Sequence, residues 1–105
     1  MRAMYAVVRD NRFDPRKRAQ GDSQVAEFQS AHADRAGYCG SVTLDAGGGR
    51  ELTLTLWRSR DEAESARIAL APAIERLLVP LMAEPSILVG VGEVIFDDLA
   101  VPPAR

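Results

Sequence analysis

The fold is decided by residues 38–57, which read YCGSVTLDAGGGRELTLTLW. Apolar and polar residues alternate on both sides of the glycine run Gly47–Gly49, and a period of two is typical of strands that bury one face. Glycine also permits the positive φ angles that a tight turn between paired strands requires. The stretch therefore predicts a β-hairpin, with strands over residues 38–46 and 50–57.

The register of this hairpin follows from the position of its turn. A turn centred on Gly48 places large aliphatic residues opposite one another, and the expected pairs are Leu44 with Leu52, Val42 with Leu54, and Gly40 with Leu56. We predict that this aliphatic face meets the helices. The opposite face then carries mainly polar side chains, which are Cys39, Ser41, Thr43, Asp45, Glu51, Thr53 and Thr55, together with Trp57.

The residues before the hairpin predict one strand and two helices. Ala3–Arg9 is a short apolar segment with a β-branched pair, and the turn residues Asp10 and Asn11 end it. A short helix begins at Asp14, because Asp accepts hydrogen bonds from free backbone N–H groups and proline suits the next position. A longer helix runs from Asp22 or Ser23 to about Ala36, is ended by Gly37, and has a face made of Val25, Phe28 and His32.

The residues after the hairpin predict a helix and a final strand. Ser59 and Glu62 have the spacing of a capping box, so a helix begins there, and Pro72 and Pro80 bend or break it before Met82. Ser86–Phe96 is rich in Ile and Val and predicts a strand, in which Gly90 and Gly92 allow a bulge or a close backbone approach. Residues 102–105 are expected to form a loose tail.

The order of these elements predicts the fold class. Strand, helix, strand, strand, helix, strand is the βαββαβ order of the ferredoxin-like α+β fold, an antiparallel four-stranded sheet with helices on one face. A chain of 105 residues is short for more than one domain, so we expect a single domain with its core over about residues 3–97. The sheet face without helices would be poorly solvated, which predicts a homodimer through that face.

Composition excludes several classes of partner. A formal net charge of -2 provides no overall attraction to nucleic acid or to an anionic membrane surface. Cys39 and His32 are the only residues of their types, so they cannot form a disulfide or fill a zinc site without several carboxylates. No apolar run approaches the roughly 18 to 20 residues that cross a bilayer, and residues 1–10 meet a charge too early for a signal peptide. These features predict a cytoplasmic protein without a metal.

Three segments carry a resemblance to a known family. They are Ala36–Ser41, with a Gly-aromatic-x-Gly entry to a strand, Leu52–Ser59, with a Trp-x-Ser exit, and the Ala-rich helix start Asp61–Ala66. In these features the chain resembles the antibiotic biosynthesis monooxygenase family. The resemblance implies a dimeric α+β barrel with a pocket between sheet and helices in each subunit. Haem-degrading relatives use a His after the third strand, and residues 59–82 contain none, so haem degradation is disfavoured.

Two residues are candidates for chemistry. The pKa of His32 makes it the natural general base, although a hydrogen-bonded or pocket-lining role is favoured. Trp57 matches the family tryptophan and is either an active group or a packing residue, with packing favoured. The thiol of Cys39 would need a nearby cation to act as a nucleophile, so a small buried hydrophobe is the favoured interpretation.

The predicted ligand site combines a phenol, a cation and small polar groups. Tyr5 and Arg9 share one strand face, and they point to one cavity if that face is also the face of Trp57, although a solvated or packed role is favoured for both. Asn11 offers an amide to a carbonyl oxygen, with a turn role as the alternative. The residues predicted to bind the ligand are Tyr5, Arg9, Asn11, Cys39, Ser41, Thr55 and Trp57.

The leading hypothesis is a homodimer that binds a small hydrophobic or aromatic molecule and oxidises it without any cofactor. In such a reaction the protein supplies orientation and a dry, polarising pocket, and an electron-rich substrate reacts with oxygen directly. The alternative is a non-catalytic module that binds a ligand or another protein.

Overall fold

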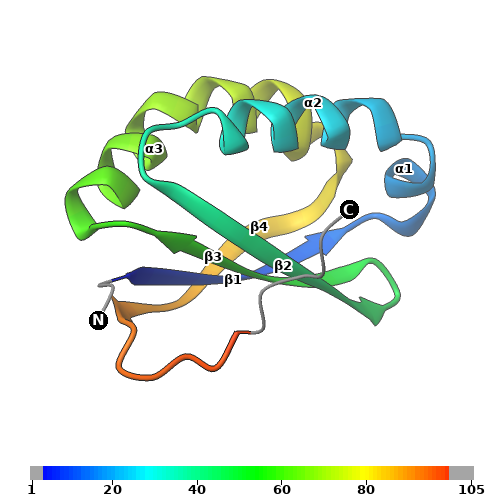
Figure 1. The fold of residues 1–105 in the computed structure, drawn as a ribbon. Helices are drawn as coiled ribbons and strands as arrows, with labels where there is room; N and C mark the ends of the chain where they lie inside the picture. Colours follow the sequence, from blue (N-terminus) through cyan, green and yellow to red (C-terminus); the bar gives the residue numbers. More distant parts are fainter. Residues whose placement is uncertain (1–3, 100–105) are drawn as a thin grey trace, which may run out of the picture.

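The computed structural model describes residues 4–99. Its strands form one antiparallel sheet in the order β2-β3-β1-β4, with bounds Tyr5–Phe13 (β1), Tyr38–Gly47 (β2), Arg50–Trp57 (β3) and Met82–Glu93 (β4). The helices α1 (Pro15–Ala19), α2 (Asp22–Ala33) and α3 (Arg60–Ala73) all lie on one side of this sheet (Figure 1). A π-helical turn, η1 (Ile74–Leu78), and a 3-10 turn, η2 (Val79–Leu81), connect α3 to β4. The predicted ferredoxin-like α+β fold is confirmed.

The predicted hairpin register is confirmed, but its faces are reversed. Leu44 pairs with Leu52, Val42 with Leu54 and Gly40 with Leu56. The side that meets the helices is nevertheless the one that carries Thr55 and Trp57, which are only 5% and 3% exposed. Val42 and Leu44 lie on the uncovered side and are 58% and 59% exposed. Alternation separates two faces of a strand, but it does not identify the face that the chain's own helices cover.

The core between sheet and helices is built around Trp57. Its indole packs with Ala63, Ala66 and Leu70 of α3. The small alanine side chains let the helix approach the sheet while the indole fills the space between them. Side chains from both halves of the chain complete this core, and they are Tyr5, Val7, Phe28, Ala31, Tyr38 and Ile74.

Strand β1 continues past the turn residues that were predicted to end it. Asp10 is buried within the strand, where its carboxylate accepts hydrogen bonds from Arg50 at 3.1 to 3.3 Å. Arg12 also lies 3.6 Å from it. The hydrogen bond from Arg50 lowers the pKa of Asp10, so the charge is held and compensated. A local sequence pattern could not show this compensation, because Arg50 is distant along the chain.

The helix ends agree with the sequence at most positions. Asp14 caps α1 by accepting hydrogen bonds from two backbone N–H groups, and Ser59 caps α3 through the N–H of Glu62. Gly21, rather than Asp22 or Ser23, precedes α2, which ends at Ala33 instead of Ala36. Gly37 has the expected positive φ, of 85°, but it does not cap the helix, because the C-cap residue of α2 is Asp34.

In the last part of the chain the predicted break of the helix before Met82 is confirmed, whereas the final strand has other bounds than predicted. Helix α3 runs through Pro72 and then widens into η1, while Pro80 lies in η2. Strand β4 begins at Met82 rather than Ser86 and ends at Glu93 rather than Phe96, and its pairing with β1 shifts beside Gly90. The predicted tail, 102–105, lies outside the described residues. Within residues 4–99 no helix is long and apolar enough to cross a membrane.

Candidate functional site

The side of the sheet that faces the helices carries most of the predicted ligand-binding residues. On β1, Tyr5 pairs with Trp57 and Arg9 pairs with Thr53 of β3. Side chains two residues apart on a strand share a face, so Tyr5, Arg9 and Asn11 lie on the same side as Thr55 and Trp57. The condition set for Tyr5 and Arg9, that they share the face of Trp57, is therefore met.

Aromatic rings from three elements surround His32 of α2. The centroid of its imidazole lies 5.3 Å from that of Trp57 and 5.4 Å from those of Phe28 and Tyr38. Tyr38 meets Trp57 edge-on, at 5.8 Å and 81°. This aromatic group, composed of Phe28, His32, Tyr38 and Trp57, joins α2 to β2 and β3.

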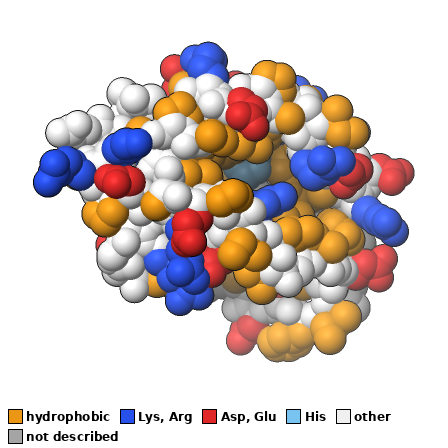
Figure 2. Space-filling model, turned by 180° about the vertical axis from the view of Figure 1, so that it is seen from behind, with side chains coloured by type: hydrophobic (Ala, Val, Ile, Leu, Met, Phe, Trp, Pro, Cys, Tyr) orange, Lys and Arg blue, Asp and Glu red, His pale blue; other side chains and the backbone are white. Residues whose placement is uncertain are grey.

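The imidazole of His32 is half-buried and remains reachable from solvent. Figure 2 shows a histidine side chain, the colour of which identifies the single histidine of the sequence, at the bottom of a hollow bordered by hydrophobic side chains and a basic one. Within residues 4–99 neither of its ring nitrogens forms a hydrogen bond. Burial lowers the pKa of His32 below its ordinary value, because burial disfavours the charged ring. The neutral ring can therefore accept a proton from a molecule in the hollow.

Three polar side chains form a chain of hydrogen bonds between β1 and β4. The guanidinium of Arg9 donates to Ser86 Oγ at 3.3 Å, and Ser86 Oγ donates to Asn11 Oδ1 at 2.5 Å. All three residues are half-buried. Sequence reasoning missed Ser86, because its partner Asn11 is 75 positions away and only its polarity beside an apolar run marks it.

Cys39 lies apart from this arrangement, whereas Ser41 belongs to it. Cys39 is exposed, and its thiol donates to the Gly37 carbonyl at 3.4 Å. The pairing of β2 skips it between Tyr38 and Gly40, which turns its side chain away, so its interpretation as a buried hydrophobe is wrong. Ser41 is exposed, but it pairs with Thr55 on the helix-facing side of the sheet and accepts a hydrogen bond from the Tyr38 hydroxyl at 3.2 Å.

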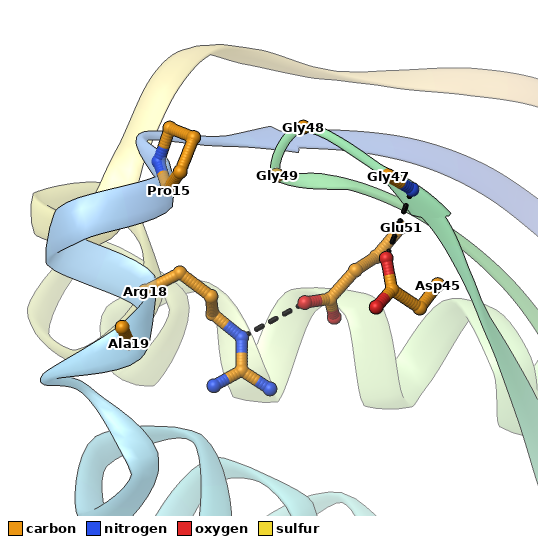
Figure 3. Close-up of a pocket in the computed structure, with 8 residues that line it drawn as sticks. All are labelled: Pro15, Arg18, Ala19, Asp45, Gly47, Gly48, Gly49 and Glu51. Atoms are coloured by element: carbon orange, nitrogen blue, oxygen red, sulfur yellow. Dashed lines mark hydrogen bonds and ion pairs between the residues drawn. The ribbon is translucent and has the colours of Figure 1, made fainter.

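A second hollow lies beside the hairpin turn, far from the aromatic group. It measures about 350 Å³ and lies between α1 and residues 45–51 (Figure 3). Arg18 points toward Glu51, and its Nε donates to the carboxylate at 2.9 Å. Asp45 accepts the N–H of Gly47. Since these groups satisfy one another and no predicted site residue lies there, the hollow is not the candidate site.

A third hollow, of about 240 Å³, includes Tyr5 at the opposite end of β1. Its lining residues Arg58 and Ser59 hydrogen-bond to Glu62, so they too have partners. No group of three or more His, Cys, Asp or Glu residues that could hold a metal ion occurs in residues 4–99.

Comparison with known proteins places the fold. Neither a protein-family model nor a curated protein matches the chain. Solved structures do, and one is a candidate antibiotic biosynthesis monooxygenase from Nitrosomonas europaea, with a TM-score of 0.74 and 14% identity over 89% of this chain and 91% of that one. A second is the N63A mutant of SnoaB, a cofactor-independent oxygenase from Streptomyces nogalater, with a TM-score of 0.64 and 16% identity.

The SnoaB match covers 97% of this chain and 99% of that one. A candidate antibiotic biosynthesis monooxygenase from Caulobacter crescentus has a TM-score of 0.63 and 18% identity, over 89% of each chain. At these identities the likeness concerns the fold, and at that level the resemblance carried by residues 36–66 is confirmed.

Proposed function

From the fold that this chain shares with antibiotic biosynthesis monooxygenases, we propose that it is a homodimer that binds a small aromatic molecule between sheet and helices. There it oxidises that molecule with molecular oxygen and without a metal or organic cofactor. The observation that carries the proposal is the hollow that exposes His32 within the aromatic group of Phe28, Tyr38 and Trp57 (Figure 2). Aromatic rings attract other rings in offset or edge-on geometry, so this hollow suits a planar ligand.

The uncovered side of the sheet supports the dimer. Its exposed aliphatic side chains are Val42, Leu44, Leu54 and Ile87, with exposed fractions of 58%, 59%, 37% and 52%. A contiguous apolar patch on a sheet face favours association, because water is released when two such faces meet. The partner is a second copy, since homodimers with two-fold symmetry pair the same patch on both subunits.

The chemistry needs only groups that the site holds, together with oxygen. The neutral His32 imidazole accepts a proton from an activated C–H of an electron-rich ligand, and the resulting carbanion donates its electrons to O2. An activated methylene then yields a ketone and water, as R2CH2 and O2 give R2C=O and H2O. All the electrons come from the substrate, so no external reductant is required.

The test is oxygen consumption by the purified protein with an electron-rich phenol that carries an activated methylene, such as 1,8-dihydroxyanthrone. We expect uptake above that of heat-denatured protein, unchanged by a metal chelator and reduced at least about tenfold in His32→Phe. A ligand that raises the melting temperature without any oxygen uptake would instead establish the non-catalytic binding module. His32→Gln, which keeps a polar side chain, is the matched control for packing in the aromatic group.

A further inference from the structure

Arg9 differs from the other half-buried arginines in having no acidic partner. Arg12 lies 3.6 Å from Asp10, and Arg18 hydrogen-bonds to Glu51 at 2.9 Å. Within residues 4–99 no carboxylate lies within ion-pair distance of Arg9, and its side chain has one hydrogen bond, to Ser86. A cation partly removed from water is unfavourable unless a counter-charge accompanies it. Arg9 therefore lacks a counter-charge, and a ligand can supply it.

The hydrogen bonds around Ser86 determine which group of the Asn11 carboxamide is available to a ligand. A guanidinium can only donate, so Ser86 Oγ accepts from Arg9 and its single proton remains for Asn11. That proton requires an oxygen as its acceptor, which orients the Asn11 carboxamide with Oδ1 on Ser86 and leaves its NH2 group available. Arg9 and Asn11 consequently offer only N–H donors to a neighbouring molecule.

Donors of this kind select an anionic acceptor. A planar guanidinium beside an amide NH2 group matches the two oxygens of a carboxylate, and charge-assisted hydrogen bonds are about twice as strong as neutral ones. A neutral ester or ketone would accept the hydrogen bonds but would leave the charge of Arg9 uncompensated. The donors of Arg9 and Asn11 therefore favour a carboxylate.

The register relates Arg9 to the apolar core around Trp57. Val7, which packs on the core around Trp57, is two residues from Arg9 on the same face of β1. Two residues of a strand span roughly 7 Å. A bicyclic ring bound to Arg9 through its carboxylate would therefore have its far edge near Val7.

We propose that Arg9 and Asn11, positioned by Ser86, form an anion-binding site on the helix-facing side of the sheet that takes an aromatic carboxylate. This inference rests on the proposed ligand cleft and adds the class of ligand to it. Arg9 and Asn11 contact the ligand, whereas Ser86 acts through them as a positioning residue.

Two probes with the same ring system test the proposal, 2-naphthoate and its neutral methyl ester, with affinities measured by calorimetry on the full-length protein. We expect naphthoate to bind at least about tenfold more tightly than the ester, and added NaCl to weaken only the naphthoate. Arg9→Met should abolish the preference while the ester still binds. Arg35→Met removes an exposed charge elsewhere and should leave the preference intact.

Two further variants keep the test independent of folding defects at Arg9. Asn11→Asp is nearly isosteric and places a carboxylate at the site, so naphthoate affinity should fall at least about tenfold with little change for the ester. Ser86→Ala frees the Asn11 carboxamide to rotate, which should reduce the ratio of the two affinities but not the affinity for the ester.

Equal affinity for both probes, or a preference that survives in Arg9→Met, would overturn the anion site and leave the aromatic cleft standing. Binding of neither probe would overturn both the anion site and the cleft on which it rests. Oxygen uptake with phenols is a separate measurement, so loss of the anion preference does not affect the oxidation proposal.

Discussion

The imidazole of His32 lies 5.3 Å from the indole of Trp57, between ring centroids, with the ring planes tilted by 58°. This contact joins α2 to β3. One partner, Trp57, is 3% exposed, whereas His32 is half-buried. The two residues predicted as catalytic candidates therefore meet, but only His32 remains available to a ligand, and Trp57 supports it from within the core.

Trp57→Ala should lower the free energy of unfolding by about 3 to 5 kcal/mol, the usual cost of truncating a buried large aromatic. The indole is buried by helix α3 of the same subunit, so the loss of free energy concerns the folding of the subunit and not its association with a second copy. Urea denaturation at a fixed protein concentration measures it. Trp57→Phe, which retains a ring, should lose less than half as much, and a loss below about 1 kcal/mol for Trp57→Ala would contradict the core described here.

Stability should decrease as the pH falls below about 6.5, the ordinary pKa of histidine. Burial lowers the pKa of His32 in the folded state, so between the folded and the unfolded pKa the unfolded chain binds more protons. The contribution of the neutral His32 to the free energy of unfolding is fully present above the pKa of the unfolded state, and it is lost as the pH falls through this window toward the pKa of the folded state. Denaturation midpoints at pH 5.5 and 7.5 check the direction.

The control for this pH dependence is His32→Phe, which removes the titrating group and keeps a ring. Its midpoint should change less than that of the unaltered protein between the same two pH values. An equal change in both proteins would assign the effect to carboxylates instead.

Leu44→Glu should separate the proposed dimer without unfolding the subunit. Leu44 is 59% exposed on the uncovered sheet face, so a charge there is tolerated in a single subunit but would be desolvated between two faces. Sedimentation equilibrium should show a loss of affinity of at least about tenfold, with unchanged far-ultraviolet circular dichroism. Thr43→Glu, on the opposite face of the same strand, should remain dimeric, and an unaltered protein that sediments as a monomer at micromolar concentration would refute the dimer.

Gly49→Ala should be more costly than Gly48→Ala. Both glycines have positive φ angles, of 88° and 64°, so alanine strains the backbone by about 1 to 2 kcal/mol in each case. A Cβ on Gly49 would also stand 2.1 Å from the carbonyl oxygen of Phe13, whereas nothing lies within 4 Å at Gly48. Thermal denaturation of the pair isolates this overlap, which we expect to add about 1 to 3 kcal/mol. Equal costs would contradict the close approach of the turn to β1.

Local patterns predicted the elements that local chemistry determines. The glycine run placed the hairpin turn and hence the pairing of Leu44 with Leu52, and Ser59 marked the start of α3. The prediction of the face that the helices cover was wrong, because a row of aliphatic side chains can pack equally well against a layer of helices or against a second sheet. The strand residues Tyr38 and Trp57, which carry larger aromatic side chains, face the helices.

Features that depend on distant residues escaped the sequence. The extension of β1 through Asp10 required Arg50, which lies 40 positions away, and the hydrogen-bonded chain of Arg9 and Asn11 required Ser86. The candidates Arg9 and Asn11 could be proposed because they alternate on one strand, but the absence of an acidic partner for Arg9 within residues 4–99 becomes visible only when β4 is in place.

The uncovered row of Val42, Leu44 and Leu54 also affects the life of a newly translated copy. Until another surface covers them, these side chains form an exposed apolar surface of the type that chaperones bind and that quality-control proteases encounter first. Association of two copies is slower at low concentration, so under the proposed dimer a copy made at low abundance stays in that state longer. The steady level of this protein in a cell should therefore fall more than proportionally when its synthesis is reduced.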